Sequence, residues 1–261
     1  MGRREVWELA EASFSFLSKI SPNIVFPLFV HIKDINKNEN VGGEKMNINI
    51  TKLLEMLENY EDQQNRLFIK VVNEENEPEN TPVRRICDLV LYVSALIPEM
   101  GTNNNICTVG VNYGLLEKWG VDEDTLFNDA MNNTVNVLGR KLITLNSAIG
   151  VPDEVNSPLV LMARRGDQFG AGILFAGDTM ELIGNTVEKI TGNGSYYVLP
   201  SSIHELIIVP ERHLEDTNAS LDHLKEMVEQ VNSTDAVSEN EFLSNNVYYY
   251  DANEKSFSIA A

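Results

Sequence analysis

The densest apolar stretch of the chain, Ser195–Pro210, is divided by a short polar insert. Its sequence, SYYVLPSSIHELIIVP, places a run of aromatic and aliphatic residues on each side of Ser-Ser-Ile-His-Glu. Short apolar runs of this kind, bounded by turn-forming residues, are typical of buried β-strands. The pattern therefore predicts one buried strand, a corner at the insert and a second buried strand.

Further strands are predicted where short apolar runs lie between turn-forming residues. Pro27 favours an edge or a bulge for the first of them, because proline has no amide hydrogen to donate. The expected strands span Asn23–Ile32, Leu67–Val72, Leu89–Ile97, Ile106–Val111, Pro158–Ala163 and Asn245–Tyr250. Gly101 and several asparagines lie between the third and the fourth of these strands, which suits a hairpin connection.

Apolar residues spaced three or four apart predict helices between these strands. The expected helices span Glu5–Ile20, Thr51–Tyr60, a segment capped by Asp122 that ends before Gly139, a segment from Thr179 to Gly192, and one from Asn218 or Ser220 to Val231. Ser238-x-x-Glu241 has the spacing of a capping box and predicts a short helix. Gly170–Ala176 fits either a strand or a helix.

Strands and helices without a regular β-α-β alternation predict an α+β fold. We expect a mixed, largely antiparallel sheet with helices packed mainly on one face.

The chain is strongly acidic, with 39 acidic and 20 basic residues among 261 and a net charge of −19. Such a surface repels phosphates and anionic lipids, so direct binding of nucleic acid or of a membrane is not expected. Residues 211–261 alone hold eleven acids and three bases. An acidic surface usually serves solubility, and the alternative is a face that mimics DNA.

Only two cysteines occur, Cys87 and Cys107, and each lies in an apolar run. Both are therefore expected to be small core residues without a disulfide. No apolar run has the length of a membrane span. Glu5, Glu8 and Glu11 precede the most apolar early stretch, which is wrong for a signal peptide. A cytoplasmic location is expected.

Reactive side chains are concentrated in the corner between the two strands, at Ser201, Ser202, His204 and Glu205. A serine nucleophile needs a histidine base within hydrogen-bond reach and a third group that orients the ring. Ser202 and His204 lie two residues apart, which leaves them too far apart for a good bond on a strand. The favoured interpretation is a capping box, in which Ser202 caps one helical turn and Glu205 returns the bond.

Neither the histidines nor the glycines complete a metal or cofactor motif. His204-Glu205 begins like the zinc-protease pattern His-Glu-x-x-His, but Ile208 stands where the second histidine is required. The glycine-rich segment 166–177 does not match Gly-x-Gly-x-x-Gly, so close packing or a tight turn explains it better. We expect no cofactor and no metal.

The C-terminal part of the chain carries a distinctive series of phrases. They are YYVLPSSIHE (Tyr196–Glu205), Val209-Pro210, Met227-Val228 with Val231-Asn232, and Leu243-Ser244 with VYYYD (Val247–Asp251); upstream, Asp88-Leu89, Val111-Asn112, Trp119-Gly120 and Ala130 with Asn133-Thr134 fit the same pattern. The series resembles the uncharacterised bacterial domain-of-unknown-function family 5688. The resemblance covers residues 47–251 as a single α+β domain. Residues 1–46 depart from it as a divergent N-terminal helix and strand, and residues 252–261 are expected to form a loosely held tail.

The resemblance implies a bacterial cytoplasmic protein, often encoded near mobile elements, and it implies no reaction. Ser201, Ser202, His204 and Glu205 are the site positions that match its phrase. Because no catalytic set is complete and the surface is acidic, the leading hypothesis is a non-enzymatic accessory protein that acts through a protein partner. The alternatives are a hydrolase or transferase centred on Ser202 and His204, and an acidic DNA mimic that binds a DNA-processing enzyme.

Overall fold

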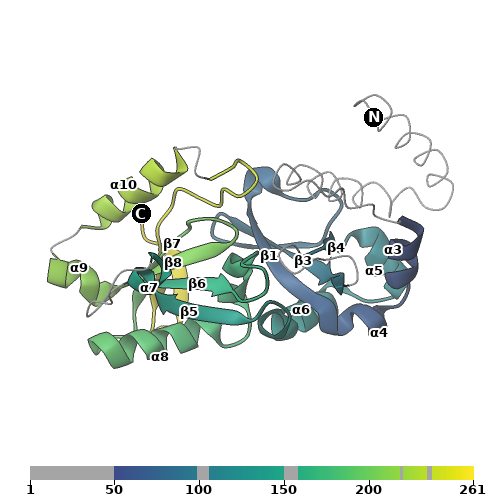
Figure 1. Cartoon of the computed structure of the whole chain (residues 1–261), viewed down its shortest axis with the longest axis horizontal. Helices are drawn as coiled ribbons and strands as arrows, with labels where there is room; N and C mark the ends of the chain where they lie inside the picture. The colour runs from purple at the N-terminus through teal and green to yellow at the C-terminus, as the bar shows by residue number, and fades with distance from the viewer. Residues whose placement is uncertain (1–49, 99–105, 150–157, 218–219, 234–236) are drawn as a thin grey trace.

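The computed structural model describes residues 50–98, 106–149, 158–217, 220–233 and 237–261 (Figure 1). Its helices are α3 (Ile50–Met56), α4 (Tyr60–Gln63), α5 (Tyr113–Trp119), α6 (Glu123–Leu138), α7 (Leu145–Ile149), α8 (Thr179–Thr191), α9 (Glu211–Thr217) and α10 (Leu221–Asn232), with the 3₁₀ helices η2 (Gln64–Arg66), η3 (Glu74–Asn76) and η5 (Gly170–Phe175). Its strands are β1 (Leu67–Asn73), β2 (Val83–Ile86), β3 (Leu89–Leu96), β4 (Thr108–Gly110), β5 (Arg140–Thr144), β6 (Leu159–Ala163), β7 (Tyr196–Leu199), β8 (Glu205–Pro210), β9 (Tyr248–Asp251) and β10 (Ser256–Ile259).

The expected N-terminal helix and strand, Glu5–Ile20 and Asn23–Ile32, lie outside the described residues. The same holds for the expected domain boundary at residue 47, which stays a prediction. Within the described ranges the α+β class is confirmed, and every strand pairing is antiparallel.

The strands form two sheets where a single sheet was expected. In the first, β3 pairs with β1 along one edge and with β2 and then β4 along the other. In the second, the order is β10-β9-β7-β8-β6-β5. Hydrophobic spacing identifies strands without specifying which of them pair, so it does not reveal this division.

Alternation along the strands of the second sheet gives its two faces separate cores, because successive side chains point to opposite sides. Tyr196 and Val198 of β7 belong to the main core, which also contains Ile183 and Val187 of α8. Leu199 of β7 instead belongs to a smaller core beneath α9 and α10. The helices therefore cover both faces of this sheet, with α8 on one side and α9 and α10 on the other (Figure 1).

The helix ends follow the local signals in the sequence. The Asp122 carboxylate accepts the Thr125 amide at 2.7 Å, and Gly139 ends α6 with φ of 75°. The Ser220 hydroxyl accepts the His223 amide at 3.1 Å and begins α10. These caps satisfy amides that have no partner within the helix, which fixes where each helix starts.

The expectation of a loosely held tail over residues 252–261 is wrong. β10 pairs with β9, and Phe257 packs edge-on to Phe175 at 5.5 Å and stacks on Tyr248 at 5.2 Å. The Asp251 carboxylate accepts the amides of Asn253 and Glu254, so it stabilises the connecting turn. One inward aromatic side chain and a tight turn are enough to make an edge strand.

The expectation that both cysteines are buried is half wrong, since Cys107 is buried but Cys87 is exposed. Ile86 and Leu89 are paired residues of β2 and β3, so Cys87 and Asp88 are the two central residues of the hairpin turn. Cys87 has φ of 56°, which suits such a turn. The apolar residues on either side of Cys87 are parts of two strands, not one buried run.

Candidate functional site

The corner between β7 and β8 is an irregular loop and not a helical turn, so the predicted capping box is wrong. The Ser202 hydroxyl accepts the His204 amide at 3.0 Å, and the Ser201 hydroxyl donates to the Glu205 carboxylate at 3.1 Å. The Ser202 amide donates to the Glu205 carbonyl at 3.2 Å. Because the chain returns here between two paired strands, these bonds close a reversal and leave no room for a turn of helix.

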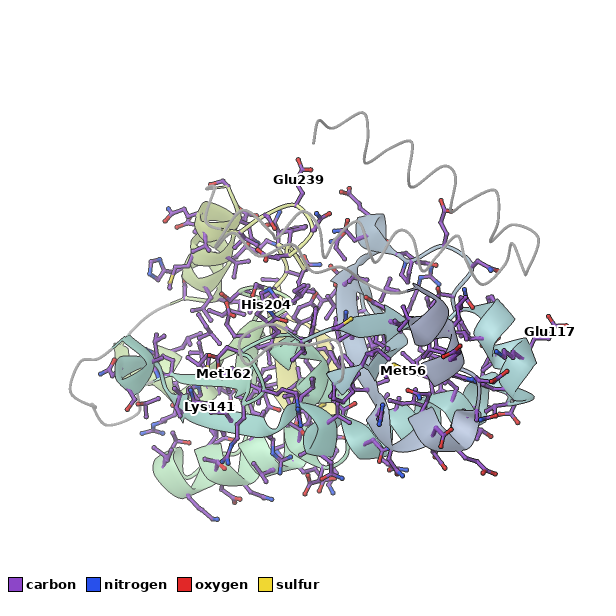
Figure 2. The ribbon with its side chains drawn as sticks, turned by 45° about the vertical axis from the view of Figure 1, so that its right-hand side comes forward. Met56, Glu117, Lys141, Met162, His204 and Glu239 are labelled. Atoms are coloured by element: carbon purple, nitrogen blue, oxygen red, sulfur yellow. The ribbon has the colours of Figure 1, made fainter. Side chains whose placement is uncertain are left out.

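Both ring nitrogens of His204 are engaged. Nδ1 accepts the Phe169 amide at 3.2 Å, and Nε2 lies 3.2 Å from Oε1 of Glu241. Because Nδ1 accepts a hydrogen bond, the neutral ring carries its proton on Nε2. Nε2 then donates a hydrogen bond to the Glu241 carboxylate. The side chain is 24% exposed and lies near the centre of the molecule (Figure 2).

The predicted serine–histidine chemistry is not assembled by this geometry. Among the described residues, the serine hydroxyls of the corner bond to the backbone or to Glu205 and not to the imidazole of His204. Glu241 does supply a carboxylate behind the ring, as a catalytic histidine would need. Since Nδ1 is occupied by a backbone amide, the ring has no lone pair left to activate a nucleophile.

Phe169 connects this corner to the first sheet. Its ring centroid lies 5.8 Å from that of His204, and the Lys70 ammonium lies 3.7 Å from the Phe169 centroid. Lys70 is only 4% exposed and donates to the Thr108 hydroxyl at 2.8 Å. Phe169 has φ of 62°, a left-handed conformation that costs a non-glycine residue about 1–3 kcal/mol. The ring contacts, and the hydrogen bond from the Phe169 amide to His204, hold Phe169 in this conformation.

The glycine-rich segment after Phe169 packs between the two sheets, as the close-packing interpretation predicted. The Gly170 amide donates to the His204 carbonyl at 2.9 Å. A Cβ on Gly170 would lie 2.3 Å from that carbonyl oxygen, and a Cβ on Gly172 would lie 2.1 Å from the Ile69 carbonyl oxygen of β1. Only glycine fits such backbone contacts. We call the set Lys70, Phe169, Gly170, Gly172, His204 and Glu241 the sheet junction.

Glu241 reaches the junction from a turn, where a short helix was expected. Its backbone carbonyl accepts the Ile203 amide at 3.0 Å, so the turn is fixed to the corner by main chain as well as by side chain. Burial favours the neutral carboxyl, but bonds from Ser238 and from the His204 ring outweigh it and lower the pKa of Glu241. The predicted contact between Ser238 and Glu241 is therefore present, but the short helix that it was expected to begin is not.

The junction therefore joins four distant segments: β1, the start of η5, the β7–β8 corner and the turn before β9. Its polar groups are paired with one another, which suits a structural clamp more than a site that receives a ligand. Within the described ranges, no group of three or more His, Cys, Asp or Glu side chains is arranged to hold a metal ion. No described helix has the length and apolar character needed to cross a membrane.

A different surface is offered by α10. Leu224 and Val228 are buried against the smaller core, but Met227 and Val231 on the same helix are 42% and 46% exposed. The apolar spacing of this helix had suggested one buried face. Asp222, Glu226 and Glu229 are also exposed and follow one side of α10. The apolar stripe of α10 is wider than the surface that it covers, and this width was the signal in the sequence for a partly exposed face.

A groove on the other side of the second sheet was not predicted. It lies between α8 and the β9–β10 turn and has a volume of about 310 Å³. Its lining residues include Glu181, Glu188, Asn193, Tyr250 and Lys255. Sequence reasoning missed it because Lys255 lies in the segment that was expected to be a loose tail.

Comparison with models of protein families matches residues 30–252 to DUF5688, a family of unknown function. The match begins earlier than the resemblance visible by eye, which started at residue 47. No curated protein and no solved structure matches the chain.

Proposed function

The chain belongs to the DUF5688 family, and we propose that it acts by binding a protein partner through the exposed face of α10. The observation that carries this proposal is the pair Met227 and Val231, which are 42% and 46% exposed beside the buried side chains of the same helix. Neighbouring exposed apolar residues on a helix, with polar residues around them, are typical of a surface that enters the groove of another protein.

The charge of α10 indicates the chemistry of the partner. Asp222, Glu226 and Glu229 are exposed on the helix, and Lys225, its only lysine or arginine, donates to the Asn246 side chain at 3.1 Å. A surface that complements α10 would place an apolar groove beside lysine or arginine side chains. Complementary charge also speeds the encounter of the two proteins.

We propose that this interaction takes place in the bacterial cytoplasm. We also propose that the protein has an accessory role, encoded on a mobile element. The location is supported by the free thiols of Cys87 and Cys107, since disulfides are rare in a reducing compartment. The accessory role is supported by the resemblance to the family and by the net charge of −19, which favours solubility and disfavours phosphates.

The test is a photo-cross-linking amino acid placed at Met227 in cells of the source bacterium. We expect one major cross-linked protein, which is then purified and titrated with the wild-type chain and with a Met227→Ser, Val231→Ser variant. The variant should bind about tenfold more weakly or worse, because a loss of about 1.4 kcal/mol of apolar burial is tenfold in affinity.

The matched control is Ile190 on α8, which is 46% exposed on the opposite side of the sheet. A cross-linker there should not capture the same protein, and Ile190→Ser should leave the titration unchanged. Equal capture from both positions, or equal binding by all variants, would overturn the role of α10.

The second candidate is a hydrolase or transferase centred on Ser202 and His204. The observation in its favour is the Glu241–His204 pair, with 3.2 Å between carboxylate and ring. It requires the Phe169 amide to leave Nδ1 and a serine to turn toward it. Turnover by the purified protein in a panel of ester, amide and phosphoester substrates, lost on His204→Ala, would favour this candidate over the binding role.

The DNA-mimic candidate has less support. Of the C-terminal acids, Glu211 accepts bonds from Asn193 and Tyr249, Glu241 accepts one from His204, and Asp251 caps a turn. Carboxylates used inside the protein do not form a row that imitates phosphates along one face.

A further inference from the structure

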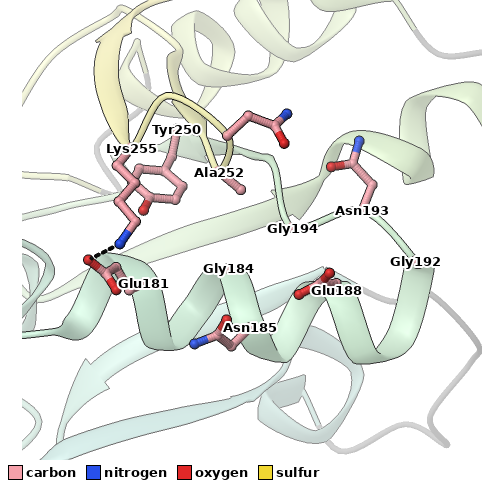
Figure 3. A pocket seen from close by; sticks show the side chains of 11 residues that line it. Glu181, Gly184, Asn185, Glu188, Gly192, Asn193, Gly194, Tyr250, Ala252 and Lys255 are labelled. Atoms are coloured by element: carbon pink, nitrogen blue, oxygen red, sulfur yellow. Dashed lines mark hydrogen bonds and ion pairs between the residues drawn. The ribbon is translucent and has the colours of Figure 1, made fainter.

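The groove beside α8 is built from two separate parts of the chain (Figure 3). One wall is α8, which contributes Glu181 and Glu188. The other is the β9–β10 turn, and the segment after α8 closes one end. A Cβ on Gly184 would lie only 3.2 Å from the Gly194 carbonyl oxygen, so the helix and this segment are packed backbone to backbone. The groove is therefore a fixed feature of the fold.

A cationic side chain of the protein itself lies in this groove. The Lys255 ammonium is 3.0 Å from Oε1 of Glu181, and Figure 3 shows the lysine reaching across to α8 beside the Tyr250 ring. The two side chains are 63% and 54% exposed. Exposed ion pairs are weak because water screens both charges, so another cation of similar size can displace Lys255.

A second carboxylate, Glu188, lies farther along the same wall. It follows Glu181 by seven residues, which is about 10 Å along a helix. Glu188 and Asn253 both line the groove, and among the described residues no hydrogen bond or ion pair is found for either side chain. Two carboxylates about 10 Å apart, one held by a weak internal pair, define the spacing of a ligand with two positive charges.

We propose that this groove binds an extended segment of a partner protein that carries two basic residues three positions apart. In the polyproline II conformation, residues three positions apart lie on the same side of the chain and about 9 Å apart, which matches the separation of the two carboxylates. One basic side chain replaces Lys255 at Glu181, and the other binds Glu188. The amide side chain of Asn253 offers a donor and an acceptor to the backbone of the segment.

This site does not rest on the proposed role of α10. Ile183 and Val187 place α8 on the main-core face of the second sheet, and α10 covers the other face. The groove also differs from α10 in chemistry, because it presents charge and amide groups where α10 presents apolar side chains. The two sites can therefore fail or succeed independently.

The experiment is a fluorescence-anisotropy titration of the full chain with a labelled peptide, Gly-Ala-Lys-Ala-Ala-Arg-Ala-Gly, at low ionic strength. Glu188→Gln and Glu181→Gln should each weaken binding about three- to fivefold, the range expected for loss of one exposed ion pair. Lys255→Gln should strengthen binding by a similar factor, because it removes the internal competitor.

Two variants with the same changes of charge elsewhere serve as controls. Glu226→Gln on α10 removes one acid without touching the groove, and Lys189→Gln removes one exposed base that does not line it. Both should leave the affinity within about twofold of wild type. A peptide with adjacent basic residues should bind more weakly than the spaced one.

Several results would overturn the proposal. No binding of the spaced peptide would do so, and so would equal effects of Glu226→Gln and Glu188→Gln, which would show attraction by net charge alone. Spermidine that competes as well as the peptide would show a site for polyamines and not for a protein segment. Binding that Met227→Ser with Val231→Ser abolishes would place the peptide on α10.

Discussion

The two faces of the six-stranded sheet are covered in different ways. On one face, α8 and η5 join a core that continues into the first sheet, and Ile183 and Val187 of α8 are fully buried. On the other face, α10 rests on a small separate core through Leu224 and Val228, which are 5% and 6% exposed. The first face holds the fold together, and the second presents a helix to solvent.

This difference teaches where to look for function in the chain. The residues with reactive side chains gather at the sheet junction, where each is used by another part of the protein. The residues with less distinctive side chains, on α10 and along the groove, are the ones left available to a partner. Chemical reactivity in the sequence therefore marked the structural centre more than the proposed interaction surfaces.

The strongest test of the comparison is Gly172→Ala in the sheet junction. The new Cβ would lie 2.1 Å from the Ile69 carbonyl oxygen, so the backbone of two segments must separate. We expect a loss of about 4–5 kcal/mol in the free energy of unfolding, or no folded protein, because backbone cannot repack as side chains do. Urea denaturation measures it.

Gly177→Ala is the matched control, since Gly177 has φ of 56° but no atom within 4 Å of an added Cβ. It should lose only the cost of a left-handed alanine, about 1–2 kcal/mol. Similar losses for the two variants would mean that η5 does not join the sheets by close contact.

A pair of truncations separates the two faces directly. Ile183→Ala in the main core should lower the global free energy of unfolding by about 3 kcal/mol. Leu224→Ala should act mainly on α9 and α10, because their core is separate. Hydrogen exchange should show faster exchange of α10 amides in Leu224→Ala with β7 and β8 unchanged. Uniform acceleration in both variants would show that the two faces unfold as one unit.

His204 variants test whether the junction is a clamp. His204→Ala removes the acceptor of the Phe169 amide and the donor to Glu241, and should cost about 2 kcal/mol. His204→Asn should recover about half of this, because its side-chain oxygen takes the position of Nδ1. Thermal unfolding measures both, and no recovery by asparagine would show that the Phe169 bond contributes little.

The smallest expected effect is a dependence on acid pH. The pKa of Glu241 is lowered in the folded state from its ordinary value of 4.5 by bonds from Ser238 and His204, which outweigh burial. Its stabilising contribution is therefore complete above 4.5 and is lost as the pH falls through the folded pKa. Glu241→Gln should flatten this acid limb in denaturation curves from pH 6 to pH 3. An unchanged limb would contradict the assignment.

Much of the fold could be predicted from local signals. Apolar runs located β1, β3, β6, β7 and β8, and caps such as Asp122 and Gly192 located the ends of α6 and α8. The strands β2 and β5 were missed because their residues are only partly buried and include Arg84, Arg85 and Lys141. An edge strand rich in long basic side chains lacks the hydrophobic signal on which such reasoning depends.

The site was harder to predict because its partners are distant in sequence. His204 was identified as the residue to examine, but Phe169 and Glu241 lie 35 and 37 residues away from it. Their contacts depend on how η5 packs between the sheets, and nothing in the local spacing of Ser201–Glu205 encodes that. The groove could be predicted only with the position of β10 known. The polar composition of residues 252–261 gave no sign of that strand.

The place of η5 between the two sheets also bears on the order in which the protein folds. Gly172 packs against Ile69 of β1, and the corner that receives Gly170 is in turn closed by Glu241. Closing such long loops costs entropy before the contacts form, which makes folding slow. During synthesis, the junction cannot be completed until Glu241 has emerged from the ribosome. Until then, part of the apolar surface of the earlier segments stays uncovered.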